Sequence, residues 1–66
     1  MSRILKVKQV AAEINVSVPQ VYKLVSIGRF PKPIKLGERC SGWLTTEIDA
    51  WIQSRVDARD EEVANG

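Results

Sequence analysis

The sequence contains no histidine, a single cysteine (Cys40) among 66 residues, and no long apolar run. One cysteine cannot form an internal disulfide, and the common zinc ligand sets need histidine or several cysteines. No stretch approaches the ~20 apolar residues of a membrane span, and the first residues lack the apolar run of a signal peptide. We therefore expect a soluble, cytoplasmic protein without a metal or cofactor.

The chain is short enough for only one small domain, which must use most of its apolar side chains for a core. Little is left to line a deep catalytic cleft. Cys40 has no evident base beside it, and no glycine-rich loop opens a helix to bind phosphate. Only four aromatic residues are present, which disfavours binding of single strands by base stacking. The sequence indicates a protein that is not an enzyme.

The net charge of +2 hides a strong asymmetry. Residues 1–46 contain eight basic and two acidic side chains, whereas residues 47–66 contain two basic and six acidic ones. Such a separation indicates that the first two thirds of the chain contact a polyanion. An ordinary solvated surface is the alternative, and charge alone does not decide between the two.

The clearest local signal predicts a helix that begins after Ser17 and ends near Gly28. Ser17 and Gln20 form a capping box, and Pro19 suits the first helical turn because its missing N–H would have no partner there. Gly28 is suited to the left-handed conformation that ends a helix. The apolar face of this helix consists of Val21, Leu24 and Val25.

A second amphipathic helix is predicted over residues 7–14. Its apolar side chains follow the helical spacing of three and four residues, at Val7, Val10, Ala11 and Ile14. No capping side chain precedes it, and Asn15 is a plausible left-handed terminator. Because only a few residues separate the two helices, they must cross as a helix-turn-helix.

The segment after Gly28 predicts a wing, which is a short hairpin attached to the helix-turn-helix. Two prolines force an extended path over residues 30–32, and Phe30 is expected to pack beneath the helices. The alternation in residues 34–36 is typical of a half-buried strand. Gly37 and Gly42 bracket a polar tip that includes Arg39.

The last predicted helix is capped by Thr45 or Thr46 and ends near Arg59. Its buried stripe is expected to contain Ile48, Trp51, Ile52 and Val56, and Trp43 is also expected in the core. The fold class is thus mainly α with a small β-hairpin, a winged helix-turn-helix of three helices plus a wing. We divide the chain into a DNA-binding domain (residues 1–59) and an acidic, disordered tail (60–66).

Nine residues on the second helix, the following turn and the wing are candidates for DNA contacts: Ser17, Val18, Pro19, Gln20, Tyr22, Lys23, Arg29, Lys35 and Arg39. Glutamine can bond adenine at two atoms, lysine can reach guanine or a phosphate, and valine can contact a thymine methyl. The serine and the arginines suit backbone phosphates or the minor groove. The alternatives are that Ser17 and Gln20 only cap the helix, that Tyr22 is a core aromatic, and that Lys23 is merely solvated.

Several segments together resemble the AlpA family of prophage regulators, within the wider group of MerR-like and excisionase-like winged helix-turn-helix proteins. The matching segments are Leu5-Lys-Val-Lys-Gln-Val10, Ser17-x-x-x-Val-Tyr-Lys-Leu24, Gly28-Arg-Phe-Pro-Lys-Pro33, Lys35-Leu-Gly37, Gly42-Trp43 and Glu47-Ile-Asp-Ala-Trp-Ile52. By position, the resemblance assigns Ser17, Tyr22 and Lys23 to the recognition helix and Arg39 to the basic tip of the wing. Relatives often carry a basic residue at the position of Val18 and a small polar one at that of Pro19, so an apolar contact is expected there.

The resemblance implies a phage or mobile-element protein that binds specific double-stranded DNA and regulates transcription. An excisionase role, in which several copies bend attachment-site DNA, remains the alternative. The expected partners are double-stranded DNA and either an integrase or recombinase or RNA polymerase. The protein is expected to be a monomer or weak oligomer that binds DNA cooperatively. A protein-interaction module that binds no DNA is the rival from another class.

Overall fold

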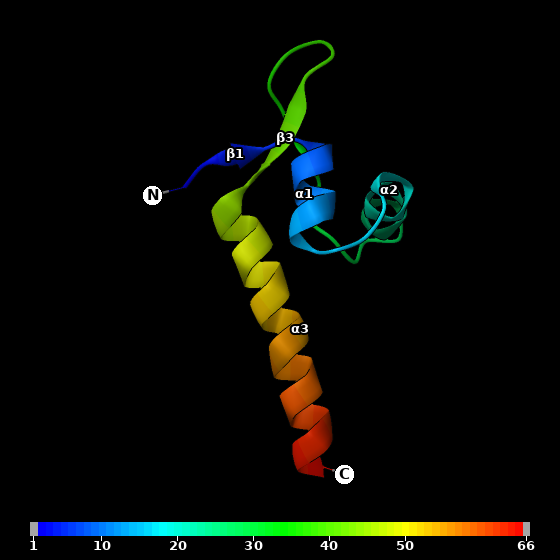
Figure 1. Cartoon of the computed structure of the whole chain (residues 1–66), viewed down its shortest axis with the longest axis vertical. Helices are drawn as coiled ribbons and strands as arrows, with labels where there is room; N and C mark the ends of the chain where they lie inside the picture. Colours follow the sequence, from blue (N-terminus) through cyan, green and yellow to red (C-terminus); the bar gives the residue numbers. More distant parts are fainter. Residues whose placement is uncertain (1, 66) are drawn as a thin grey trace.

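The computed structural model describes residues 2–65, and their side chains up to residue 62. It has three helices and a three-stranded antiparallel sheet, so the expected winged helix-turn-helix fold is confirmed (Figure 1). In chain order the elements are β1 (Ile4–Leu5), α1 (Val7–Glu13), α2 (Val18–Ser26), β2 (Ile34–Lys35), β3 (Ser41–Leu44) and α3 (Thr45–Asn65). None of the helices described is both long and apolar enough to cross a membrane.

The sheet joins the start of the chain to the wing. β3 is the central strand, and β2 pairs with it to form the predicted hairpin, with Ile34 opposite Gly42. On its other edge β3 pairs with β1, with Leu5 opposite Trp43. The sequence did not predict β1, because two apolar residues are too few to show the alternation of a strand. This long-range pairing fixes the wing relative to the first helix.

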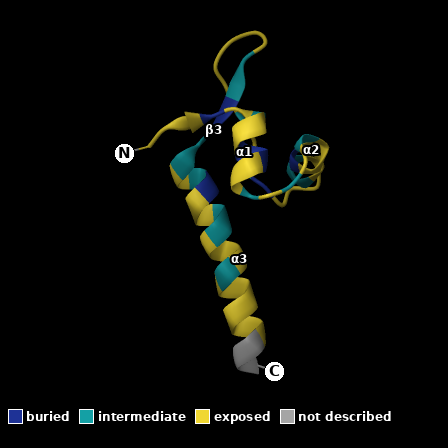
Figure 2. Ribbon diagram, in the orientation of Figure 1, coloured by how far each residue is buried: buried dark blue, intermediate teal, exposed yellow. Residues whose placement is uncertain are grey.

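The core lies where the two helices of the helix-turn-helix, the sheet and the first turns of α3 meet (Figure 2). Its buried side chains are Leu5, Val10, Ala11, Val21, Phe30, Trp43 and Ile48. Trp43 is fully buried, and its Nε1–H donates to the carbonyl of Pro31 at 2.7 Å. The Phe30 ring lies 6.2 Å from Trp43 and 5.0 Å from Trp51, centroid to centroid. Phe30 therefore packs as predicted.

Local signals at the helix ends agree with the structure. One of the two bonds of the predicted capping box is present, since the Oγ of Ser17 accepts a hydrogen bond from the Gln20 amide at 3.3 Å. Gly28 has a φ of 74°. Asn15 also adopts a left-handed conformation, with a φ of 58°. The start of α1 is capped although no Ser, Thr, Asp or Asn precedes it: the Gln9 side chain accepts a hydrogen bond from the backbone N–H of Lys6 at 2.9 Å.

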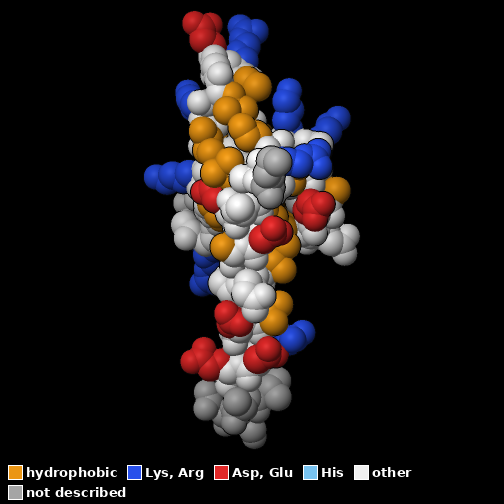
Figure 3. Space-filling model, turned by 90° about the vertical axis from the view of Figure 1, so that its left-hand side faces the viewer, with side chains coloured by type: hydrophobic (Ala, Val, Ile, Leu, Met, Phe, Trp, Pro, Cys, Tyr) orange, Lys and Arg blue, Asp and Glu red, His pale blue; other side chains and the backbone are white. Residues whose placement is uncertain are grey.

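The expectation that residues 34–36 form a half-buried strand is wrong. Ile34 is 37% exposed and Leu36 is 45% exposed. Register explains this, because Ile34 pairs with Gly42, whose neighbour Trp43 points to the opposite face and into the core. Ile4 is also exposed, and a Cβ built at Gly42 would lie 2.6 Å from Ile4 Cγ2 and 3.5 Å from Leu36 Cδ1, so these side chains lie on the same face of the sheet. Figure 3 shows a cluster of hydrophobic side chains in the upper part of the molecule.

The predicted cap of the last helix is also wrong. The helix already includes Thr45, so neither threonine occupies the capping position before it. The Oγ1 of Thr45 instead accepts a hydrogen bond from the Arg3 amide at 2.9 Å. The carboxylate of Glu47 accepts from the Leu44 amide at 3.3 Å and supplies the cap. The threonine hydroxyl is thus used to attach the first residues of the chain to α3.

The last helix is longer than predicted. It continues to Asn65 instead of ending near Arg59, and its second half extends away from the core (Figure 1). Ile48 is buried, and Trp51 and Ile52 pack half-buried against the core. Val56 is half-buried farther along the same helix. Residues 60–65 are helical where a disordered tail was expected, and Gly66 lies outside the described residues. The division of the chain at residue 60 stays a prediction.

Candidate nucleic-acid interface

α2 has one face in the core and one face in solvent. Val21 is fully buried, and Leu24 and Val25 are half-buried against the core. Tyr22 and Lys23 are on the exposed side, and Tyr22 is 52% exposed. The alternative in which Tyr22 is a core aromatic is therefore wrong. α2 thus exposes a phenol and an ammonium group at two consecutive positions.

The N-terminal tip of α2 is mostly exposed. The side chains of Ser17, Pro19 and Gln20 are accessible, although the Ser17 hydroxyl already caps the helix. Val18 differs from the other candidates because it is half-buried and packs against the core. Only part of its surface remains available for an apolar contact. The tip therefore offers an amide and an apolar edge rather than a charge.

The wing carries Arg39 on a tight turn. The amides of Leu36 and Gly37 both donate to the carbonyl of Cys40, at 2.7 and 3.1 Å, and close the turn. Arg39 is exposed on this turn. Lys35 is also exposed, and its backbone pairs with that of Ser41 across the hairpin.

A shallow hollow of about 170 Å³ lies between α2 and the wing. Tyr22 of α2 and Arg39 of the wing both line it, so the structure brings two of the candidate residues to one surface. The complete lining is Lys6, Val7, Tyr22, Arg39, Cys40 and Ser41. No carboxylate is among these residues, so the hollow has a positive lining.

The other candidates lie outside this hollow. Lys23 follows Tyr22 on the exposed face of α2, and Lys35 lies in β2. Arg29 is in the turn after α2, where its carbonyl accepts a hydrogen bond of 2.6 Å from Trp51 Nε1 while its side chain is exposed. Among the side chains that the structure describes, the single ion pair joins Arg59 and Asp60. The cations of α2 and of the wing are therefore not neutralised within this part of the chain.

Two polar residues of the hollow, Lys6 and Ser41, were not among the sequence candidates. Lys6 directly follows β1, and the pairing of Leu5 with Trp43 is what brings it beside the wing. Ser41 begins β3. No local pattern marks either residue, because their proximity depends on the sheet. Predicting that these two residues line the hollow would have required knowing that β1 pairs with β3.

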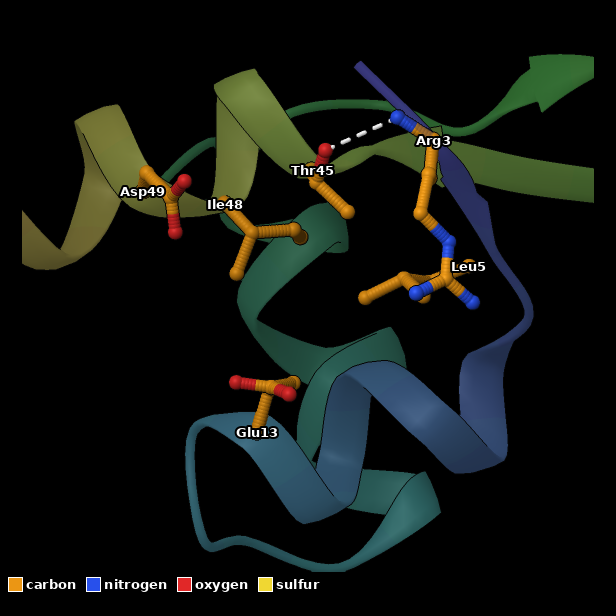
Figure 4. A pocket seen from close by; sticks show the side chains of 6 residues that line it. All are labelled: Arg3, Leu5, Glu13, Thr45, Ile48 and Asp49. Atoms are coloured by element: carbon orange, nitrogen blue, oxygen red, sulfur yellow. Dashed lines mark hydrogen bonds between the residues drawn. The ribbon is translucent and has the colours of Figure 1, made fainter. Parts of the chain in front are cut away.

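A second hollow, of about 190 Å³, has a different character (Figure 4). It lies between β1, the end of α1 and the start of α3, and it is lined by Arg3, Leu5, Glu13, Thr45, Ile48 and Asp49. Two carboxylates line it, which makes it unsuited to a polyanion. Within the described residues there is no cluster of three or more histidine, cysteine or acidic side chains that could hold a metal ion.

The fold and this surface define a small winged helix-turn-helix protein with exposed basic groups on its second helix and wing. Comparison with known proteins agrees with the resemblance found in the sequence. The chain belongs to the family described as prophage CP4-57 regulatory protein (AlpA), whose model matches residues 3–56.

A relative in Enterobacteria phage P4, described as uncharacterized protein ORF88, is 33% identical over 57 residues. The alignment covers 86% of this chain and 65% of the phage protein, so the chain spans slightly less than two thirds of that relative. No solved structure matched the chain.

Proposed function

We propose that this protein is a DNA-binding regulator of a phage or other mobile element, which recognises a specific double-stranded sequence with α2 and the wing. The observation that carries the proposal is the hollow shared by Tyr22 and Arg39. A helix and a hairpin tip that line one surface, here through Tyr22 and Arg39, can contact the base edges and the backbone of a duplex together. Membership of a prophage regulatory family supports the same function.

In this proposal α2 enters the major groove. Gln20 and Lys23 are exposed on consecutive turns and supply the hydrogen-bonding groups that distinguish base pairs, adenine for the amide and guanine for the ammonium. Pro19 and the accessible edge of Val18 offer apolar contact at the helix tip. The bases are read by these side chains, whereas the wing contributes affinity.

Backbone contacts come from residues around α2. Arg39 and Lys35 project from the wing and are placed to contact phosphates or the minor groove. Arg29 supplies a further cation past the end of α2, on a backbone held by Trp51. The Ser17 hydroxyl caps α2 and is also close to the amides that suit a phosphate.

We infer a regulatory role in transcription, with an integrase or recombinase or RNA polymerase as a protein partner. An excisionase would use the same surface but would bend its DNA with several adjacent copies. Measurement of the bend angle by gel shift on the selected DNA separates the two roles. No catalytic step is part of the proposal, and a cytoplasmic location stays a prediction.

The test starts with selection of bound sequences from random duplexes, followed by titration of the selected duplex with Lys23→Ala. This variant should fold normally because Lys23 is exposed, and it should lose about 1–3 kcal/mol of specific binding free energy. Lys8→Ala is the matched control, since Lys8 is an exposed lysine on the outer side of α1. Selection that enriches no sequence, or binding that does not depend on salt, would refute the proposed function.

A further inference from the structure

The hollow between α2 and the wing has the chemistry of an anion site. Its lining includes two residues with cationic side chains, Lys6 and Arg39, and two with hydroxyl groups, Tyr22 and Ser41. Cationic and hydroxyl donors of this kind are those that proteins use for phosphate oxygens. Since no acidic side chain lines the hollow, nothing within the lining competes for these donors.

Hydrogen bonds hold the backbone at or beside both cationic residues, Lys6 and Arg39. The N–H of Lys6 is held by Gln9 Oε1 at 2.9 Å, at the start of α1. Arg39 is on the turn closed by two hydrogen bonds to the Cys40 carbonyl. Neither cation forms an ion pair with a carboxylate among the described side chains. Both residues are exposed, and they line one hollow from separate parts of the fold.

Building on the proposed function, we infer that one phosphate of the DNA backbone binds in this hollow. Lys6 and Arg39 supply the charge, and the hydroxyls of Tyr22 and Ser41 donate to the remaining oxygens. Lys6 is then a DNA-binding residue that belongs to neither the recognition helix nor the wing. Tyr22 contacts the backbone rather than a base, which leaves base recognition to Gln20 and Lys23.

In this inference, some residues of the interface contribute only affinity and others select the bases. A backbone phosphate is the same in every sequence, so Lys6 contributes to affinity and does not select bases. A phosphate held between α1, α2 and the wing also fixes how far α2 can turn in the groove. Loss of Lys6 should therefore weaken binding to selected and unselected duplexes by the same factor.

The first experiment compares Lys6→Ala with Lys8→Ala on the selected duplex and on a mixed-sequence duplex over a range of salt concentrations. Lys6→Ala should weaken binding to both duplexes about tenfold, as expected for one charged hydrogen bond. It should also lower the slope of log K against log salt by about 1. Lys8 is exposed on the first turn of α1 but does not line the hollow, so Lys8→Ala should have a smaller effect on both quantities. The fold is expected to survive, because the bond to Gln9 uses the backbone of residue 6.

The second experiment uses Cys40, the one cysteine of the chain, which is half-buried in the lining of the hollow. Its rate of alkylation should fall when duplex DNA is bound. Inorganic phosphate at the same phosphate concentration should not slow it, because a free anion lacks the other contacts of the duplex. Equal protection by inorganic phosphate would overturn the inference by making the hollow a free-anion site.

The two proposals fail in different ways. If Lys6→Ala behaves like Lys8→Ala while Lys23→Ala loses specific binding, the phosphate subsite is wrong and the proposed function stands. An unchanged rate of Cys40 alkylation on bound DNA would lead to the same conclusion. If the wild-type protein binds no duplex, both proposals are wrong.

Discussion

At the scale of single residues, two indole rings connect the helices to the wing. Trp43 is fully buried, and its Nε1–H donates to Pro31, which precedes the wing. Trp51 is half-buried, packs edge-on against Phe30, and donates to the carbonyl of Arg29. In a domain this small, two such rings provide a large share of the buried apolar area. The two indole hydrogen bonds also hold the carbonyls of Arg29 and Pro31, and so they fix the path of the chain after α2.

We expect Trp43→Ala to cost about 3–5 kcal/mol of unfolding free energy, because it removes a fully buried ring. That cost is comparable with the whole stability of a small domain, so the variant should be unfolded. Trp51→Phe keeps a ring against Phe30 but loses the bond to Arg29, and it should cost only about 1 kcal/mol. Thermal unfolding followed by circular dichroism measures both. A Trp43→Ala protein that melts like the wild type would contradict this account of the core.

Residues whose role is local could be predicted from the sequence, whereas residues whose role depends on distant pairing could not. Ser17, Asn15 and Gly28 behave as predicted, because capping and left-handed conformations involve neighbours a few positions away. The role of Thr45 was missed because its hydroxyl bonds to Arg3, forty-two positions earlier. Lys6 was missed for the same kind of reason, since only the pairing of β1 with β3 brings it to the hollow.

At the scale of elements, α2 and the wing are positioned in different ways. α2 is defined by its own ends and rests on the core through one apolar face. The wing is placed by β3, which pairs with β2 on one side and with β1 on the other. Gly42 of β3 lies close to β1. A Cβ built there would lie 2.6 Å from Ile4 Cγ2 and 2.9 Å from the Leu5 carbonyl oxygen.

Gly42→Ala should therefore destabilise the sheet by about 1–3 kcal/mol, because the backbone of β1 must move away from β3. Gly37→Ala is the matched control at the other end of the hairpin tip, where a Cβ would meet only Cys40 Cβ at 3.8 Å. Urea unfolding of the two variants tests the prediction. Equal stability of both would show that β1 is not packed against the wing in this way.

At the scale of the whole molecule, charge is separated along a body of 47 × 27 × 18 Å. Most Lys and Arg side chains lie around the upper part, which also carries an acidic side chain at its top, whereas several acidic side chains gather around the lower part of α3 (Figure 3). The distal half of α3 carries Asp57, Asp60, Glu61 and Glu62. This arrangement favours an approach to DNA with the sheet and helices first and with the acidic end of α3 pointing away. The charge asymmetry was predictable from the sequence, but the extension of α3 away from the core was not.

The most direct measurement of the central claim is a titration of the isotope-labelled protein with its selected duplex, followed residue by residue in amide NMR spectra. We expect the largest shifts at Tyr22, Lys23 and Arg39, and no change at residues 53–62 of α3. Shifts confined to the distal half of α3, or no shift at both Tyr22 and Arg39 under conditions where the duplex is bound, would show that α2 and the wing do not form the DNA interface.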